Sequence, residues 1–410
     1  MSTATLPAKF GNLRKAVRSR LLERDDEIEI MLLALLARTH AFFLGEPGIA
    51  KSMMIEALIE NVEGLDPNDY FHTLFMKSST FESVFGPLDI TALKEGRYRY
   101  KPEGFLPLAK IAFIDEIWKA NGAILNALLW ATNERLYRND GKVESIPLHS
   151  VFCASNEMPE NDELQAIYDR FPLRRQVKRI AEPGNFVNML KIASSDAPEP
   201  TPCITWTEIE QARDEVKLVT VPEDVLEALS DIKEKLRNEN IFPSDRRFGQ
   251  CIRIVQAAAW LEGETEAEVE HLHPLRHVLW SDVNDIPTVE SMLLAISNPI
   301  DLEIQAIMEG LAGLSVAIDQ VINDGGDDDM KERAGAEIYE KIEASKGELV
   351  EISGRLKGSK KRTGKLDAAI DQVTNLTSRL LIKVFKTTPE QIEKGLKRFK
   401  DEMSAGDDDE

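Results

Sequence analysis

The stretch FFLGEPGIAKSMMIEAL, residues 42–58, decides the fold of this chain. An apolar run ends in a loop with two glycines, and a helical pattern begins at Lys51. This is the order of a phosphate-binding loop, G-x-x-x-x-G-K-[ST], except that Ala50 stands where the pattern has its second glycine. If Ala50 has right-handed helical dihedral angles, its extra methyl group costs little.

The loop has the groups that a nucleotide needs. Its backbone N–H groups and the positive end of the following helix would face phosphate oxygens. Lys51 would reach the β- and γ-phosphates of ATP, and the Ser52 hydroxyl would bind Mg²⁺. We expect nucleotide contacts from Gly45, Glu46, Pro47, Gly48, Ile49, Ala50, Lys51, Ser52 and Met53. A strand–turn–helix with a chance ending of this type is the alternative.

Two further apolar runs end in polar residues. KIAFIDEI, residues 110–117, ends in Asp115 and Glu116. Asp115 would hold Mg²⁺ and Glu116 would activate a water molecule, although two carboxylates here could instead cap the next helix. HSVFCASNE ends in Asn156, whose amide could orient that water or simply form a turn.

Short apolar runs alternate with helical patterns between residues 40 and 180. Such alternation predicts an α/β core, a mostly parallel sheet with flanking helices. The predicted strands are 40–45, 70–76, 110–115 and 149–155, and the predicted β-hairpin inserts are 92–107 and 135–150. A helix is expected at 120–134.

Four regions follow from changes in composition. We expect an N-terminal helix with the α/β nucleotide-binding core (1–198), an α-helical lid (199–297), a long helical arm (298–402) and a disordered acidic tail (403–410). In the arm, apolar residues recur at helical spacing on three segments. They are Leu302, Ile304, Ile307, Met308, Leu311 and Leu314; Ile338, Ile342, Leu349, Ile352 and Leu356; and Leu366, Ile370, Val373, Leu376 and Leu380.

Composition narrows the class of protein. The net charge of −21, from 71 acidic and 50 basic residues, argues against an extended nucleic-acid surface. Three dispersed cysteines fit a reducing compartment, and we expect a cytoplasmic protein without a membrane span. Zinc at His271, His273 and His277 is not expected, because Pro274 interrupts the helix that would align them. Glu23, Asp25 and Asp26 are interpreted as a solvated helix face.

GEPGIAKS, FIDEIWKANGAILNALLWATNER, ASNEMPE and YDRFPLR together resemble the MoxR family of AAA+ ATPases, and the RavA branch in particular. That branch has alanine at the position of Ala50. The resemblance covers roughly residues 10–265. RavA has a further β-rich domain in its helical arm that this chain is too short and too helical to contain, so the partner of that domain is not expected here.

The resemblance implies roles for individual residues. It assigns Lys51 and Ser52 to Walker A, Asp115 and Glu116 to Walker B, and Asn156 to sensor 1. Arg170 matches the arginine finger that reaches a neighbouring subunit's nucleotide. Its alternative is an ion pair with Asp169. Arg246 matches the sensor 2 arginine, with Arg247 as the alternative.

The implied protein is a hexameric ring that hydrolyses ATP with Mg²⁺ and remodels or matures a partner complex, often one with a von Willebrand factor A domain protein. A nucleic-acid translocase is the first alternative, because helicase-type relatives share both inserts. A nucleotide-gated scaffold with little turnover is the second.

Overall fold

The computed structural model describes residues 5–194, 201–323, 328–356, 364–387 and 399. The chain divides into two compact units, residues 1–293 and 294–410, which are described separately. The predicted acidic tail and the predicted boundary near residue 198 lie outside the described residues.

The first unit is built on a parallel sheet of five strands in the order β3-β4-β7-β1-β8. Its strands are β3 (Tyr70–Leu74), β4 (Ile111–Asp115), β7 (Ser150–Ser155), β1 (Ala41–Leu44) and β8 (Leu173–Gln176). All residues of β1 and β7 are buried, as expected for parallel strands covered on both faces. The four strands predicted from the apolar runs are confirmed.

Sequence analysis missed β8. Its sequence, LRRQ, carries two arginines, which are usually exposed. Arg174 is nevertheless buried, and its guanidinium donates to the backbone oxygens of Phe171 (2.8 Å), Tyr168 (2.8 Å) and Trp280 (2.9 Å). These bonds replace water around the charge and make burial of the strand possible.

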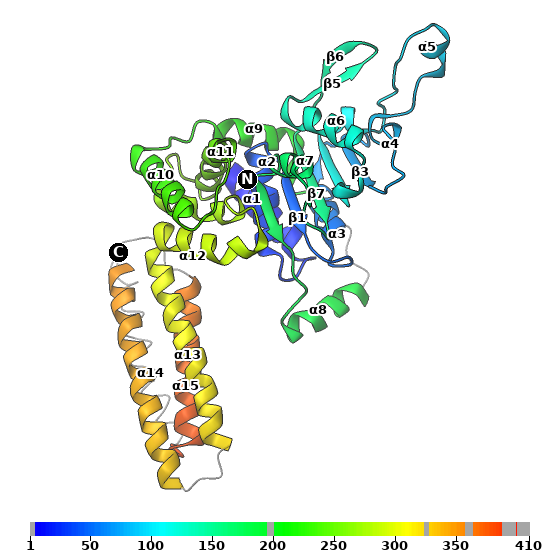
Figure 1. Ribbon diagram of the computed structural model, residues 1–410. Helices are drawn as coiled ribbons and strands as arrows, with labels where there is room; N and C mark the ends of the chain where they lie inside the picture. Colours follow the sequence, from blue (N-terminus) through cyan, green and yellow to red (C-terminus); the bar gives the residue numbers. More distant parts are fainter. Residues whose placement is uncertain (1–4, 195–200, 324–327, 357–363, 388–398, 400–410) are drawn as a thin grey trace. The chain divides into compact units, whose positions relative to one another are not determined.

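Helices flank this sheet (Figure 1). They include α1 (Leu6–Arg18), α2 (Asp25–Leu36), α3 (Lys51–Ile59), α6 (Gly122–Asn133) and α7 (Asp162–Tyr168). Helix α2 contacts β1 and β8, and α3 contacts β4. The predicted helix at 120–134 is confirmed by α6, which buries Ile124, Leu125 and Leu128. A short parallel pair, β2 (Val62–Glu63) with β9 (Ile204–Thr205), lies outside the main sheet.

The second predicted β-hairpin is confirmed. Strands β5 (Leu136–Asn139) and β6 (Lys142–Ser145) pair antiparallel. The two turn residues, Asp140 and Gly141, have φ of 49° and 73°. Positive φ at both positions is the geometry that lets a two-residue turn follow the twist of its strands.

The first predicted β-hairpin is wrong. Residues 82–108 contain short helices instead: α4 (Glu82–Phe85), α5 (Ile90–Lys94) and η1 (Leu106–Leu108). Asp89 begins α5 by accepting hydrogen bonds from the N–H groups of Thr91 and Ala92. The alternating sequence RYRY that suggested a strand forms one isolated bridge, Leu88 to Tyr100. Local capping therefore outweighs the period-two pattern.

The two inserts are bonded to each other and extend from the same end of the unit (Figure 1). Asn139 accepts from the Tyr100 N–H (2.8 Å) and donates to the Tyr100 oxygen (3.0 Å). The Asp140 N–H donates to the Tyr98 oxygen (3.1 Å), and Arg97 pairs with the Asp140 carboxylate (3.3 Å). The inserts thus form one projecting element.

The rest of the first unit is helical, and its last helix, α12, continues past residue 293. They are α8 (Pro183–Ser194), α9 (Trp206–Val216), α10 (Glu223–Asn238), α11 (Asp245–Leu261), η3 (Val269–His277), η4 (Val283–Asp285) and α12 (Ile286–Ser297). Helix α11 contacts both η3 and α2. Because α2 also contacts strands β1 and β8, the helices that follow the sheet pack against a helix that covers it.

The second unit contains three long helices, α13 (Pro299–Asn323), α14 (Asp328–Leu356) and α15 (Gly364–Lys383), which contact one another. Most of the predicted apolar residues form their shared core, including Ile304, Leu311, Ile342, Leu349 and Leu380. Full burial of each such side chain stabilises the unit by roughly 1.5–3 kcal/mol. Throughout the described parts of the chain, no helix is both long and apolar enough to cross a bilayer.

His40 is buried beside β1 in its neutral form. Its Nδ1 accepts from the Val151 N–H (2.9 Å), so Nε2 donates to the Thr132 oxygen (3.1 Å). A second ring proton would break the bond to Val151. Burial first, and Arg135 second, lower the pKa of His40 to about 3.

This geometry predicts a loss of stability in acid. The folded-state pKa lies below the value of about 6.5 in the unfolded chain, so the unfolded chain takes up the proton first as pH falls. Between pH 7 and pH 5, His40 should lower the free energy of unfolding by about 2 kcal/mol.

Chemical denaturation at both pH values, in the native protein and in His40→Asn, measures this contribution. The exposed His72→Asn controls for the loss of an imidazole. An equal pH dependence in the native protein and in His40→Asn would contradict the assignment.

Candidate functional site

Residues 45–50 turn the chain sharply between β1 and α3. A side chain at Gly45 would collide with the Ile49 Cδ1 and approach the Val177 oxygen to 2.9 Å, so the loop packs too closely for a Cβ there. Gly48 has φ of 78°. The Gly45 N–H donates to the Ser155 oxygen (2.9 Å), which fixes the start of the loop to the end of β7.

Ala50 does not have the right-handed conformation that would make alanine inexpensive. It is the N-cap of α3 with φ 68° and ψ 24°, in the left-handed region. The chain needs this conformation to enter the helix directly from the turn. A left-handed alanine costs about 1 kcal/mol relative to a right-handed one, which explains why loops of this type usually have glycine here.

Lys51 begins α3 and is buried. Its ammonium donates to the backbone oxygens of Gly45 and Glu46, so it lies over the concave side of the loop. Burial lowers the pKa of Lys51, while Asp115 and Glu116 oppose that shift. The ammonium bonds two neutral carbonyl oxygens. It can exchange these acceptors for charged phosphate oxygens, which form stronger hydrogen bonds with it.

Asp115 is the last residue of β4, and Glu116 follows it. Glu116 has φ of 53°, and its N–H donates to the Asp115 carboxylate (3.0 Å). The Glu116 Oε2 is buried without a hydrogen-bond partner. Burial, and then the charge of Asp115, raise the pKa of Glu116. A carboxylate with an unused acceptor and a raised pKa, carried on a backbone at positive φ, suits a general base.

The residues predicted for Walker A, Walker B and sensor 1 lie at one edge of the sheet. The loop follows β1, Asp115 ends β4, and the exposed Asn156 follows β7, which lies between those two strands. Because the strands are parallel, their carboxyl ends meet at the same edge. Ser52 is half-buried on the first turn of α3, beside Lys51.

Arg179 is a member of this region that sequence analysis missed. It donates from Nε to the Glu46 carboxylate (2.9 Å), which links the loop to the segment after β8. Glu23 accepts from the N–H groups of Ala181 (2.8 Å) and Glu182 (3.0 Å) in the same segment. The interpretation of Glu23 as part of a solvated helix face is therefore wrong. Nothing in the local sequence connects these residues, because they meet only through the fold.

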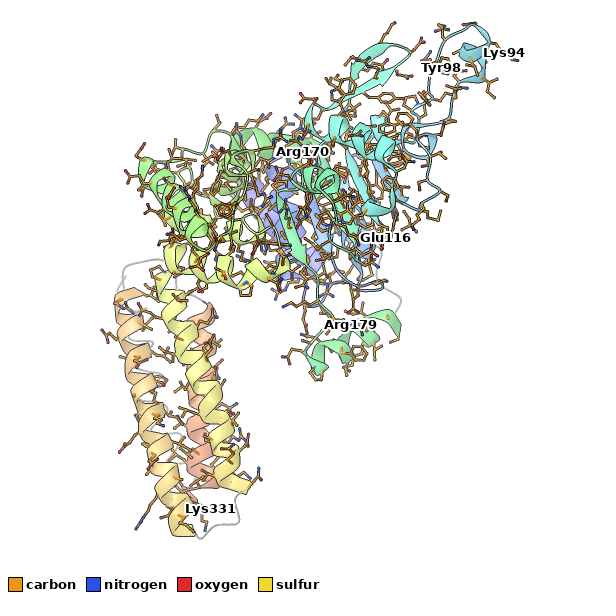
Figure 2. All side chains as sticks on the ribbon, viewed as in Figure 1. Lys94, Tyr98, Glu116, Arg170, Arg179 and Lys331 are labelled. Atoms are coloured by element: carbon orange, nitrogen blue, oxygen red, sulfur yellow. The ribbon has the colours of Figure 1, made fainter. Side chains whose placement is uncertain are left out.

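Arg170 lies at the opposite edge of the sheet. It comes just before β8, and β8 pairs with β1 in parallel, with Leu173 opposite Ala41 and Gln176 opposite Leu44. The loop follows the far end of β1. Figure 2 shows Arg170 and Glu116 in different parts of the unit. Arg170 therefore does not join the residues around Lys51 in the same chain.

Asp169, the alternative partner of Arg170, bonds other residues. Asp169 accepts from Arg247 (2.7 Å) and from the Ser244 hydroxyl (2.8 Å). Arg247 is buried and also bonds the Trp280 oxygen (3.2 Å) and the Ser281 hydroxyl (3.0 Å). Arg247 thus ties the start of α11 to the segment that carries Arg170, whereas its neighbour Arg246 is exposed.

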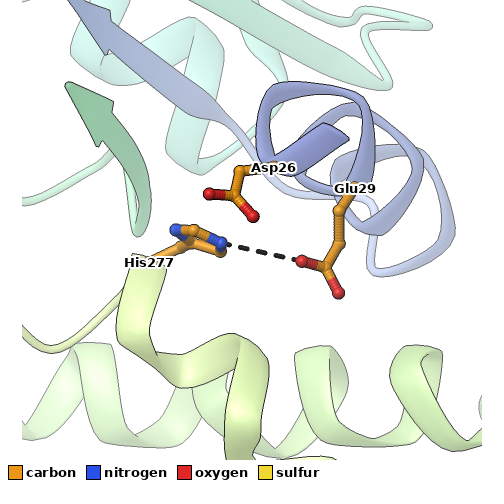
Figure 3. A group of neighbouring side chains, drawn as sticks. All are labelled: Asp26, Glu29 and His277. Carbon is orange, nitrogen blue, oxygen red and sulfur yellow. Dashed lines mark ion pairs between the residues drawn. The ribbon is translucent and has the colours of Figure 1, made fainter. Parts of the chain in front are cut away.

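A second charged cluster joins α2 to η3. Asp26, Glu29 and His277 meet there, and His277 pairs with Glu29 (Figure 3). Arg276 bonds both Asp26 (3.0 Å) and Glu29 (2.9 Å), and Arg175 also pairs with Asp26. Although burial opposes ionisation, His277 and Arg276 hold the pKa of Glu29 at about 2. We interpret the group as an ion-pair network rather than a metal centre, because arginines already neutralise both carboxylates.

Comparisons with known proteins give matches to two family models and to several relatives. Residues 8–202 match the family model described as the MoxR domain in the MoxR-vWA-beta-propeller ternary systems, and residues 224–293 match the AAA lid domain. An uncharacterised protein of Methanocaldococcus jannaschii is 41% identical over 71% of this chain and 75% of its own length. A second protein of that organism is 38% identical over 70% and 75%.

More distant similarity extends to a chaperone and a solved structure. Chaperone MoxR1 of Mycobacterium tuberculosis is 26% identical over 40% of this chain and 44% of its own. A crystal structure of a proposed ATPase from Cytophaga hutchinsonii aligns with a TM-score of 0.58 at 15% identity, covering 72% of this chain and 95% of that one. At that identity the likeness concerns the fold alone.

The left-handed Ala50 generates a stability prediction. Ala50→Gly relieves about 1 kcal/mol of backbone strain in the folded protein. It also raises the conformational entropy of the unfolded chain, which lowers stability by a similar free energy. We expect the free energy of unfolding to stay within about 0.5 kcal/mol of the native value or to rise. Ala166→Gly, at an exposed position of α7, should instead cost about 1 kcal/mol. Equal destabilisation of both variants in chemical denaturation would show that Ala50 is not left-handed.

Proposed function

Because this chain belongs to the MoxR family of AAA+ ATPases, we propose that it hydrolyses ATP with Mg²⁺ at the interfaces between subunits of a hexameric ring. The hydrolysis would drive chaperone-like remodelling or maturation of a partner complex. The observation that carries the proposal is the separation of Arg170 from Lys51 and Glu116 on opposite edges of one parallel sheet.

The separation is larger than a side chain can bridge. Strand β1 alone spans about 10 Å at roughly 3.3 Å per residue, and the loop begins beyond its end. A cation that stabilises charge on a transferring phosphoryl group must approach its oxygens directly. A catalytic Arg170 therefore requires a second subunit, and a ring supplies one at every interface.

The residues around the loop fit ATP and Mg²⁺. The Ser52 hydroxyl and the Asp115 carboxylate would hold Mg²⁺. The ion would neutralise part of the phosphate charge. Lys51 would exchange its bonds to the Gly45 and Glu46 oxygens for phosphate oxygens. Glu116 would accept a proton from the attacking water at its unpartnered Oε2, while Asn156 orients that water.

We propose that Arg246, which the resemblance assigns to sensor 2, acts from the same edge of the sheet as Arg170. Arg247 and Ser244 both bond Asp169, so the start of α11 lies against the segment of Arg170. Arg246 would then act together with Arg170 on the neighbouring subunit's nucleotide. Arg247 keeps a structural role, because its guanidinium is buried and bonded.

A protein substrate fits the projecting inserts better than a nucleic acid. Arg97 is paired with Glu95 and Asp140, which reduces the positive charge at the tip. The apolar side chains of Ile90, Tyr98 and Val143 are 67%, 69% and 50% exposed. The description of the matching MoxR domain makes a von Willebrand factor A domain protein our proposed partner. A nucleic-acid translocase would instead show ATPase activity that single-stranded DNA stimulates.

Two substitutions test the mechanism. Glu116→Gln should lower ATP turnover at least 100-fold without loss of ATP binding, because the amide cannot accept the proton. Arg170→Ala should lower turnover about 1000-fold, the usual effect of removing an arginine finger. Steady-state phosphate release and equilibrium binding of a fluorescent ATP analogue measure the two effects. The exposed Glu134→Gln and Arg237→Ala are matched controls.

Two results would overturn the proposal. Native-like turnover in Arg170→Ala excludes the intersubunit mechanism. Absence of turnover in the native protein under conditions where it binds ATP favours the nucleotide-gated scaffold.

A further inference from the structure

A cavity of about 240 Å³ lies outside the site already described and is lined by five cationic side chains. They are Arg38, Arg135, Arg213, Lys217 and Arg253, and its other lining residues are Leu36, Ala37 and Val216. No carboxylate is among these described lining residues. Such a concentration of positive charge is unexpected in a chain of net charge −21.

The cavity is separate from the phosphate-binding loop. Arg38 lies just before the amino end of β1, whereas the loop follows the carboxyl end. Arg135 lies between α6 and β5, Arg213 and Lys217 belong to the last turn of α9 and its end, and Arg253 is on α11. Four parts of the fold therefore direct cations to one place.

The carboxylates near these cations are fewer than the cations themselves, and Glu210 and Asp214 are the ones that act on Arg38. Arg135 donates to backbone oxygens, including those of Arg38 (2.9 Å) and Leu148 (2.9 Å), which hold its guanidinium in place without neutralising it. Arg213 (3.0 Å) and Lys217 (2.7 Å) share the single carboxylate of Asp214. Arg253 bonds the neutral amide oxygen of Gln256 (2.9 Å).

The pKa values of two buried neighbours reflect both their burial and this positive charge. Burial first, and then Arg38 and Arg213, lower the pKa of Arg135 to about 10. Burial and then the same arginines hold the pKa of the adjacent His149 far below its usual range. Arg38 and Arg135 are also both held at positive φ, 51° and 52°. Like charges held this close repel one another, and a bound anion would relieve that repulsion.

We propose that this cavity binds a small anion that carries phosphate groups, such as inorganic phosphate or pyrophosphate. Guanidinium groups present paired N–H donors that match phosphate oxygens, and several of them together favour a multiply charged anion over a single carboxylate. The volume is below the usual range for drug-sized ligands, roughly 300–1,000 Å³, and suits a short phosphate chain. The proposal does not depend on ATP hydrolysis.

Isothermal titration of the full-length protein with pyrophosphate, without Mg²⁺, tests this site. The measurements use the Lys51→Ala background, so that the phosphate-binding loop does not contribute. We expect saturable binding at one site per chain, weakened by added NaCl. Arg38→Ala and Arg213→Ala should each weaken it at least tenfold, because each removes a charge-assisted contact. Arg18→Ala, on the exposed surface of α1, should not change it.

Two outcomes would overturn the proposal: no saturable binding in the Lys51→Ala protein, or the same affinity after Arg38→Ala. Thermal unfolding of each variant checks its fold. If Arg38→Ala or Arg213→Ala is unfolded, the exposed Arg253→Ala decides the matter by the same criterion, because its side chain supports little of the surrounding structure.

Discussion

The parallel pairing of β1 with β7 and β8 is the constraint on which the rest of the structure depends. It brings the loop after β1, Asp115 at the end of β4 and Asn156 after β7 to one edge of the sheet. By the same pairing, Arg170 precedes β8 and lies at the other edge. We propose that these two edges are incomplete halves of one catalytic site. Joining a loop edge of one subunit to an arginine edge of the next would complete it.

Hydrogen bonds join both parts of that arrangement to the helices that follow the sheet. Asp169 bonds Arg247 and Ser244, while Arg276 bonds Asp26 and Glu29 near the start of α2. The first connection reaches the segment of Arg170, and the second reaches the helix that contacts β1 and β8. A change at the loop that shifts these helices would therefore also shift the arginine edge. Such coupling would convert a local phosphate contact into a movement between subunits.

The sequence predicted what depends on apolar burial or on a short contiguous motif. Strands β1, β3, β4 and β7 and the core of the second unit belong to this class, as do the positions of Lys51, Asp115 and Glu116. It did not predict what depends on long-range polar contacts. Strand β8 was missed because a buried arginine is not expected from residue type. The backbone oxygens of Trp280 and Tyr168 accept hydrogen bonds from Arg174, and a hydrophobic pattern does not reveal such acceptors. The helix α5 and the left-handed Ala50 were missed because capping and backbone strain override residue periodicity.

The most direct test of the shared site mixes two inactive variants. Lys51→Ala protein retains Arg170, and Arg170→Ala protein retains Lys51, so rings assembled from both contain interfaces with an intact site. The shared-site geometry predicts that the mixture recovers ATPase activity that neither variant has alone. A mixture of Lys51→Ala and Glu116→Gln should stay inactive, because those two residues act from the same chain. An inactive Lys51→Ala and Arg170→Ala mixture, with mixed rings verified by native mass spectrometry, would contradict a site shared between subunits.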